Sequence, residues 1–325
     1  MCTAVAWQSG DLYFGRTLDY ERSFGEEVVI TPRNYPLSFC GEKIMPSHYA
    51  IIGMAHAADG YPLYYDAVNE KGVAAAGLNF VGYAVYHDPI PTRKNIAHFD
   101  LIPWVLSQCG SVQEAKELLP ATNITGIAFN GMLKPAKLHW IIADKEESIV
   151  VESVADGLRI YHNPAGVLTN NPPFPQQLFQ LNNYLGLSPK EPENRFSDKL
   201  DLQIYSRGMG ALGLPGDLSS QSRFVRATFT KLHAAEGKNE KENVGQFFHI
   251  LDTVAQTDGC CILEEGSREK TIYTSCCNVN KGIYYYTTYE NRQITAIDLY
   301  HSNLDSDQLS CFVLKREEEI RFQNI

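Results

Sequence analysis

Short runs of mostly apolar residues, some of them rich in β-branched side chains, recur in the first third of the chain and are typical of buried strands. They cover residues 3–7, 12–15, 28–31, 50–54, 63–68 and 73–80. Ser9 and Gly10 separate the first two runs, and residues 69–72 separate the last two, so each of these pairs is predicted to form a β-hairpin. Helical spacing of apolar residues follows over 99–108, and a second helix is predicted from Ser111 to about residue 119.

The rest of the chain repeats this grouping of strands followed by helices. Further strands are predicted at 138–143, 148–153, 158–162, 166–169, 271–276, 282–288 and 293–299, and helices at 176–185, 222–233 and 241–257. Because strands come in runs and helices in blocks, the pattern indicates an α+β fold with antiparallel sheets rather than a doubly wound fold. The polar stretch 187–199 is expected to be an excursion within one domain that covers residues 1–325.

Charge and composition exclude several classes of partner. The chain has 28 Lys and Arg against 38 Asp and Glu, a net charge of −10, and no cluster of five basic residues, so no nucleic-acid partner is expected. No apolar stretch approaches the length of a membrane-spanning helix, and the start lacks the pattern of a signal peptide, so no membrane partner is expected. The 8 Cys are scattered and form no C-x-x-C motif, which indicates reduced thiols and a cytoplasmic location.

Two common site motifs lack their structural context. Residues 208–213 match G-x-G-x-x-G, but a Pro-Gly-Asp segment follows where a phosphate-binding helix would begin, so a mobile Gly-rich loop is predicted. The 9 histidines form no H-E-x-x-H motif and no pair at metal-ligand spacing, so no metal is expected. His139 in a predicted strand and His249 in a predicted helix are expected to be packed or hydrogen-bonded.

Cys2 is the strongest candidate nucleophile. Removal of Met1 would leave Cys2 at the N-terminus, where its own α-amine, with a pKa of about 8, is partly neutral near pH 7. That amine can take the thiol proton, and the thiolate can then attack a carbonyl. The alternative is that a cysteine at the second position is incidental.

The return strand of the first hairpin brings two charged residues near Cys2. Arg16 favours the thiolate and Asp19 can orient the amine, if the hairpin is tight. The alternative is an ion pair at the surface end of a strand.

Several segments together resemble the choloylglycine hydrolase family of N-terminal-nucleophile hydrolases, and within it the bacterial conjugated bile acid hydrolases. They are MCTAVAW, YFGRTLDY, NEKGVAAAGLNF, GVLTNNPPF, GLPGDLSSQSRFVR and KGIYYYTTYENRQITAIDL, and they match from residue 2 to about residue 300 in order and spacing. The resemblance implies a four-layer αββα sandwich with two antiparallel sheets, removal of Met1, no metal, no organic cofactor, and a homotetramer.

The resemblance also implies the role of individual residues. Cys2 matches the nucleophile, Arg16 and Asp19 match a catalytic pair, and Asn79 matches an active-site Asn. Two further assignments have a neighbouring alternative: Asn170 (or Asn171) for the oxyanion hole, and Arg223 (or Arg226) for the remaining Arg, where we prefer the first of each. Thr17 and Ala4 depart from the common Asn and Gly of the family, and we expect altered packing at most.

The implied reaction is hydrolysis of the amide that joins a bile acid to glycine or taurine. Leu18, Phe24 and Phe129 are candidates for the wall of a steroid pocket, with ordinary core packing as the alternative for each. Arg207, beside the Gly-rich loop, is a candidate contact for the anionic leaving group. Related penicillin V acylases typically carry Tyr at the position of Asn79, so penicillin V is the second choice of substrate. A non-catalytic protein that binds hydrophobic acids is the remaining alternative.

Overall fold

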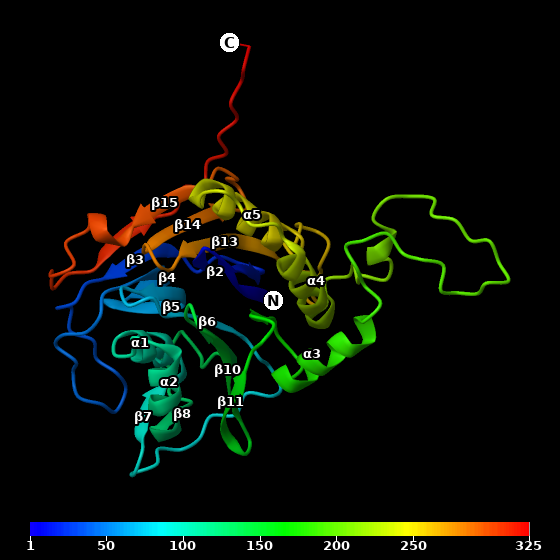
Figure 1. The fold of residues 1–325 in the computed structure, drawn as a ribbon. Helices are drawn as coiled ribbons and strands as arrows, with labels where there is room; N and C mark the ends of the chain where they lie inside the picture. Colours follow the sequence, from blue (N-terminus) through cyan, green and yellow to red (C-terminus); the bar gives the residue numbers. More distant parts are fainter. Residues whose placement is uncertain (325) are drawn as a thin grey trace.

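Two antiparallel sheets, placed face to face, form the centre of the molecule in the computed structural model, which describes residues 1–324 (Figure 1). The first sheet has six strands, in the spatial order β12 (Val167–Leu168), β1 (Cys2–Ser9), β2 (Asp11–Tyr20), β13 (Lys270–Asn278), β14 (Ile283–Thr288) and β15 (Thr295–Asp298). The second has eight, in the order β11 (Gly157–His162), β10 (Ser148–Val154), β9 (Leu138–Ala143), β6 (Ala74–Asn79), β5 (Tyr61–Asn69), β4 (Ile51–Ala58), β3 (Glu27–Thr31) and β16 (Ser310–Val313).

Helices cover the outer faces of both sheets (Figure 1). Helices α4 (Ser220–His233) and α5 (Glu240–Asp252) pack on the six-stranded sheet, whereas α1 (Leu101–Leu106) and α2 (Val112–Leu118) pack on the eight-stranded sheet. Helix α3 (Phe174–Gln180) follows β12 and contacts α4. The order helix, sheet, sheet, helix confirms the predicted α+β sandwich.

The central strands consist mostly of buried residues because both of their faces are covered. In β1 seven of the eight residues are buried, and β6 reads Ala-Ala-Ala-Gly-Leu-Asn. Where β2 meets β13, an added Cβ at Gly15 would lie 2.0 Å from the backbone oxygen of Ser275. Only glycine therefore allows these two strands to approach next to Arg16.

Most predicted elements are confirmed, with shifted ends. The first hairpin turns at Gly10, which has a φ of 68°. The helix predicted at 176–185 is shorter than expected, since α3 ends at Gln180 and continues as the 3-10 segment Leu181–Tyr184. The helix predicted at 241–257 ends at Asp252.

Three short strands and four further 3-10 segments were not predicted. Strands β7 (Lys94–Ala97) and β8 (Thr122–Thr125) form a separate parallel pair, and β16 adds to the edge of the larger sheet. The additional 3-10 segments are His98–Asp100, Leu119–Ala121, Met209–Ala211 and Leu299–His301. The Gly-rich stretch 208–213 contains the third of these and is not followed directly by a helix, since α4 begins at Ser220.

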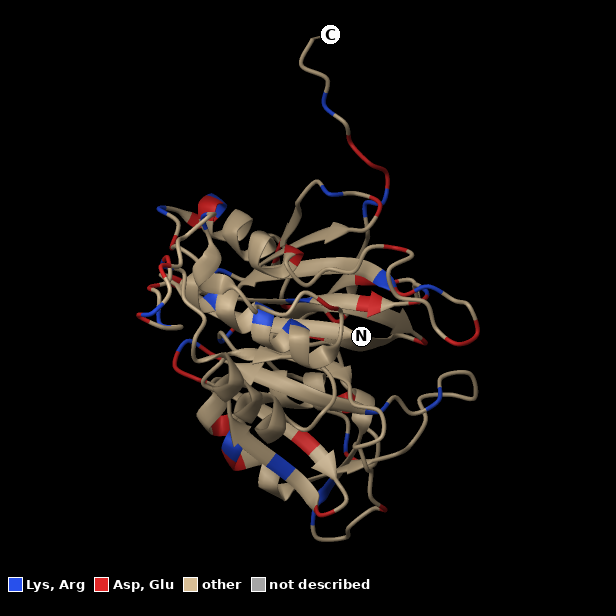
Figure 2. Cartoon of the chain, turned by 90° about the vertical axis from the view of Figure 1, so that its right-hand side faces the viewer, with Lys and Arg blue, Asp and Glu red and all other residues tan. Residues whose placement is uncertain are grey.

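No helix among residues 1–324 combines the length and apolar character needed to cross a membrane. Within the same part of the chain, no three His, Cys, Asp or Glu side chains are grouped so that they could hold a metal ion. Lys and Arg are spread over several loops and helices rather than gathered on one element (Figure 2).

Candidate active site

The first hairpin places Cys2 beside residues of its return strand. Cys2 lies opposite Leu18, and Ala4 lies opposite Arg16. Because residues two apart on a strand share a face, Cys2, Leu18 and Arg16 point the same way. All three line a cavity of about 670 Å³, and the Cys2 side chain is 3% exposed. The register agrees with the expectation that Arg16 returns close to Cys2.

Arg16 is held by backbone oxygens deep in the molecule. It is 1% exposed, its Nη1 donates to the carbonyl oxygens of Gly77 (2.5 Å) and Tyr65 (3.0 Å), and its Nε donates to that of Thr17 (3.2 Å). Its Nη2 has no hydrogen-bond partner among the described residues. One nitrogen of this buried guanidinium is therefore left without a hydrogen-bond partner among residues 1–324.

Acidic neighbours stabilise the charge on Arg16. Burial alone would lower the pKa of this guanidinium, but Cys2, Tyr273 and Asp66 raise it on balance.

Asp19 lies beside the N-terminal residue, Met1, and is fully buried. Its Oδ1 accepts from Thr271 Oγ1 (2.7 Å) and its Oδ2 accepts from Thr17 Oγ1 (3.1 Å). Its carbonyl oxygen accepts from the Met1 amine at 2.5 Å, and its amide donates to the Met1 oxygen at 2.9 Å. The Met1 amine also contacts the Glu269 carboxylate, and burial lowers the pKa of that amine. Met1, the residue next to Cys2, is therefore partly buried and held by hydrogen bonds.

Asn170 connects three of the predicted residues. Its Oδ1 accepts from the backbone nitrogen of Cys2 (2.9 Å) and from Arg223 Nη2 (2.7 Å), while its Nδ2 donates to the carbonyl oxygen of Asn79 (2.9 Å). Arg223 is fully buried, and its Nη1 also donates to the carbonyl oxygen of Cys2 (2.5 Å) and to Thr3 Oγ1 (2.7 Å). The structure thus brings Cys2, Asn79, Asn170 and Arg223 into one network.

The two alternative residues point elsewhere. Asn171 is exposed and donates to the carbonyl oxygen of Val81 (2.8 Å). Arg226 donates from Nε to the carbonyl oxygen of Thr253 (2.6 Å) and from Nη1 to that of Pro215 (2.7 Å). Neither contacts Cys2, so the geometry favours the first residue of each pair.

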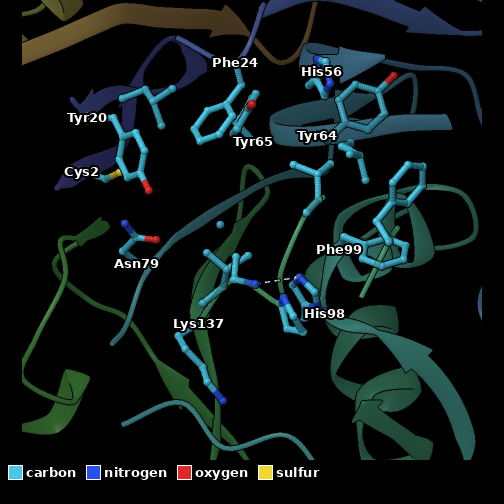
Figure 3. A pocket seen from close by; sticks show the side chains of 18 of the residues that line it. Cys2, Tyr20, Phe24, His56, Tyr64, Tyr65, Asn79, His98, Phe99 and Lys137 are labelled. Atoms are coloured by element: carbon cyan, nitrogen blue, oxygen red, sulfur yellow. Dashed lines mark hydrogen bonds between the residues drawn. The ribbon is translucent and has the colours of Figure 1, made fainter. Parts of the chain in front are cut away.

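The cavity beside Cys2 is mostly apolar. Cys2, Tyr20 and Asn79 lie at one end of it, and Phe99 lies toward the other (Figure 3). The three predicted wall residues all contribute to its lining: Leu18, Phe24 and Phe129. A cavity of this size with a few polar groups is typical of sites for small organic ligands.

Arg207 is not among the residues that line this cavity. It is exposed, on the excursion that precedes the 3-10 segment Met209–Ala211. Its proposed contact with a leaving group stays a prediction that the geometry of this chain does not support.

Other polar residues around Asn170 were missed from the sequence. The backbone nitrogen of Asn170 donates to Ser220 Oγ (2.8 Å). Gln177 Nε2 contacts the backbone carbonyl oxygen of Asn170 and donates to that of Pro172 (2.7 Å). Gln177 is fully buried and lies on the short helix α3. The sequence alone does not reveal this role of Gln177, because its contacts with residues 170 and 172 depend on the conformation of the loop between them.

The cavity wall formed by residues 129–138 was predicted only at Phe129. This segment, an irregular loop that ends where β9 begins, supplies Met132, Leu133 and Pro135 to the lining. An irregular loop has no periodicity, so a pattern of apolar residues does not reveal which of its side chains face a ligand.

The chain matches one protein family along most of its length and is similar to curated and structurally solved proteins. A family model described as linear amide C–N hydrolases, choloylglycine hydrolase family, matches residues 2–312. The chain is 54% identical to the bile salt hydrolase/transferase of Lactiplantibacillus plantarum over 98% of both chains.

Solved structures agree with this match. A variant of the conjugated bile acid hydrolase from Clostridium perfringens superposes with a TM-score of 0.92 at 37% identity, covering 99% of this chain and all of the other. The penicillin V acylase from Agrobacterium tumefaciens has a TM-score of 0.78 at 20% identity, covering 97% of this chain and 92% of the other, and shares the fold.

Proposed function

Because the chain belongs to the choloylglycine hydrolase family of linear amide C–N hydrolases, we propose that it hydrolyses bile salts, cleaving the amide between a bile acid and glycine or taurine with Cys2 as the nucleophile. The observation that carries this proposal is the position of Cys2, whose side chain lines a largely apolar cavity and whose nitrogen is bonded to Asn170.

In the proposed acylation step, the free α-amine of mature Cys2 takes the thiol proton, and the thiolate attacks the substrate carbonyl carbon. The resulting tetrahedral intermediate collapses when the Cys2 ammonium returns that proton to the leaving nitrogen. The C–N bond breaks, glycine or taurine leaves as an amine, and a thioester joins the bile acid to Cys2. Arg16 supports this step because its positive charge lies in the same cavity.

Asn170 is the proposed donor to the oxyanion. Its amide nitrogen has two hydrogens, and one of them is used by the bond to the carbonyl oxygen of Asn79. The second hydrogen is left for the charged oxygen of the intermediate. Arg223 and the Cys2 nitrogen, both bonded to Asn170 Oδ1, fix which way the amide faces.

In the proposed second step, water takes the place of the amine. The Cys2 amine accepts a proton from water, the hydroxide attacks the thioester carbon, and the S–C bond breaks as the Cys2 ammonium returns that proton to the leaving sulfur. The products are the free bile acid and the regenerated Cys2 thiol.

Asn170→Ala is expected to lower kcat about 100- to 1,000-fold with a small change in KM, because the donor is needed mainly in the transition state. Steady-state kinetics with glycocholate measures both constants. Asn171→Ala is the matched control and is expected to keep the parent kcat, since Asn171 bonds only the exposed Val81 carbonyl. An effect of Asn170→Ala confined to KM would make Asn170 a binding residue instead.

The proposed substrates are tested by kcat/KM of the mature enzyme for glycocholate, taurocholate and penicillin V. We expect both bile salts to be hydrolysed far faster than penicillin V, because the cavity is long and apolar and the short Asn79 side chain leaves room beside Cys2. A preference for penicillin V would replace the proposed substrate class. Binding of cholate without hydrolysis of any amide would favour the non-catalytic alternative.

Acyl transfer is a second proposed activity of the same thioester. It is favoured by the name of the 54% identical relative, a bile salt hydrolase/transferase. An unprotonated amine would attack the thioester carbon in place of water and give one proton to the Cys2 amine. The S–C bond then breaks, a new amide forms, and the Cys2 ammonium returns the proton to the leaving sulfur. After incubation of cholyl-taurine with an excess of another amino acid, mass spectrometry is expected to detect the new conjugate.

We also propose that the chain assembles into a homotetramer in the cytoplasm, with its cysteines reduced. Large apolar side chains are exposed on the excursion after α3 and on the turn that ends it: Phe196, Leu200, Leu202, Ile204, Tyr205 and Leu212. Clusters of exposed apolar residues of this kind usually mark interaction sites.

Leu202→Ser combined with Tyr205→Ser is expected to shift the chain from a tetramer to smaller species, because both changes remove apolar surface from the excursion. Light scattering coupled to gel filtration gives the mass of each species. Leu232→Ser, at an exposed apolar position on α4, serves as the control. If the double variant and the control both keep the parent mass, the excursion is not the assembly surface.

A further inference from the structure

A buried pair of ionisable side chains, His139 and Glu152, lies next to the site and has no part in the proposed reaction. The two residues face each other on neighbouring strands β9 and β10, and both side chains are fully buried. His139 Nδ1 and Glu152 Oε1 are in hydrogen-bond contact at 3.2 Å. Neither residue lines the cavity, so neither is placed to touch a substrate.

The pair holds both ends of the loop that carries Asn170. His139 Nε2 donates to the carbonyl oxygen of Thr169 (2.8 Å), directly before Asn170. Glu152 Oε1 accepts from the backbone nitrogen of Phe174 (2.8 Å), where α3 begins. The loop 169–174 is therefore held at its first residue by His139 and at its last by Glu152, two side chains of the eight-stranded sheet.

The same histidine also contacts the strand that carries Asn79. Its ring stacks on Phe80, with a centroid separation of 4.3 Å and an interplanar angle of 6°. Phe80 directly follows Asn79, and His139 lies opposite Leu78 in the β6/β9 register. His139 thus packs beside Asn79 on one strand and bonds next to Asn170 on the loop. These are the two residues that the Asn170 Nδ2 bond joins.

Stability alone does not account for this arrangement. Glu152 Oε2 is buried and has no hydrogen-bond partner among residues 1–324. Buried ionisable pairs seldom stabilise a fold more than apolar residues of the same volume would, and a buried oxygen without a partner adds a cost. The pair is better explained by what it positions.

We propose that His139 and Glu152 are positioning residues that set the relative placement of Asn170 and Asn79, and thereby direct the free Asn170 N–H at the oxyanion. This inference rests on the proposed function, since it assumes that Asn170 acts in the transition state. A displacement of about 1 Å at such a donor is enough to lower a rate about 100-fold.

The first test compares two variants that each remove a buried histidine. His139→Leu is expected to lower kcat for glycocholate about 10- to 100-fold, with little change in KM, because the donor moves away from the transition state. His48→Leu is the matched control: His48 also contacts two backbone carbonyl oxygens, those of Tyr49 (2.7 Å) and Tyr35 (2.8 Å), outside the cavity. It is expected to keep the parent kcat at a temperature well below the Tm of both variants. Equal kcat values for the two variants would overturn the proposal.

The second test asks whether His139 acts through Asn170. In the Asn170→Ala background the donor is already absent, so adding His139→Leu is expected to lower kcat no further. Full additivity of the two effects would show that His139 acts by another route and would contradict the proposal. If His139→Leu does not fold, the same cycle is run with His139→Gln, which keeps an amide donor for the Thr169 carbonyl and is expected to lose less activity.

These outcomes separate the inference from the proposed function. If the parent enzyme hydrolyses no bile salt, the proposed function fails before the variants are compared. If the parent is active and Asn170→Ala is impaired, but the cycle is additive, only the role of the His139/Glu152 pair fails.

Discussion

Cys2→Ala is expected to abolish amide hydrolysis, lowering kcat by about 10,000-fold or more, while the protein still folds. Cys2 supplies the sulfur that forms the proposed thioester. Tyr20, from the return strand of the hairpin, lines the same end of the cavity, but burial raises the pKa of its phenol and keeps it protonated. The change removes a single sulfur atom at the first residue of β1, so the free energy of unfolding should fall by only about 1 kcal/mol.

Cys276→Ala is the matched control for this experiment. Cys276 is a fully buried cysteine of the same sheet, in β13, and burial raises the pKa of its thiol, so it remains a protonated, inert core residue. Glycocholate turnover and thermal unfolding are measured for both variants. If Cys2→Ala hydrolyses glycocholate as fast as Cys276→Ala does, Cys2 is not the nucleophile, and a binding role becomes the better interpretation.

A chain in which Cys2 is preceded by any residue is expected to be inactive until that residue is removed. With Met1 attached, the Cys2 nitrogen is an amide whose hydrogen is donated to Asn170 Oδ1 at 2.9 Å. An amide nitrogen has no available lone pair and does not accept the thiol proton. A removable leader that ends directly before Cys2 tests this: activity should rise at least about 100-fold on cleavage, the typical contribution of a general base.

Intact mass measured alongside the rates shows which form is active. Full turnover by the uncleaved chain would exclude the α-amine as the base. The pH profile adds a further check, because Cys2 is buried and burial disfavours the charged form of an amine. The base must be neutral, so activity should rise with pH through a midpoint below the usual value of about 8.

Local pattern was sufficient to predict the hairpin that carries the nucleophile. Residues 3–7 and 12–15 are mostly apolar runs that flank a Ser-Gly turn, and the register that follows from this turn sets Arg16 opposite Ala4. Antiparallel pairing then brings Arg16 to the face that Cys2 occupies. The α+β class followed in the same way, from the grouping of strands and helices.

The other half of the site comes from segments far apart in the sequence. Asn79 ends β6, Asn170 follows β12, and Arg223 lies in α4, so no local period relates them to Cys2. They were identified only through resemblance to a family, and the choice between Asn170 and Asn171 needed the contacts themselves. His139 was expected to be packed or hydrogen-bonded, which the structure confirms, but its two partners depend on the fold of the loop at 169–174. The same expectation for His249 was wrong, since this side chain is exposed on α5.

Covalent labelling with a cholic acid derivative tests the central claim most directly. The derivative carries a fluoromethyl ketone in place of the carboxyl group, so that a thiolate in the steroid site displaces fluoride and forms a stable thioether. We expect one equivalent to attach to the mature enzyme, peptide mapping to place it on Cys2, activity to fall in proportion, and glycocholate to slow the labelling. Attachment to another residue, or complete labelling of Cys2 with full activity retained, would contradict the assignment of Cys2 as the nucleophile of a bile salt hydrolase.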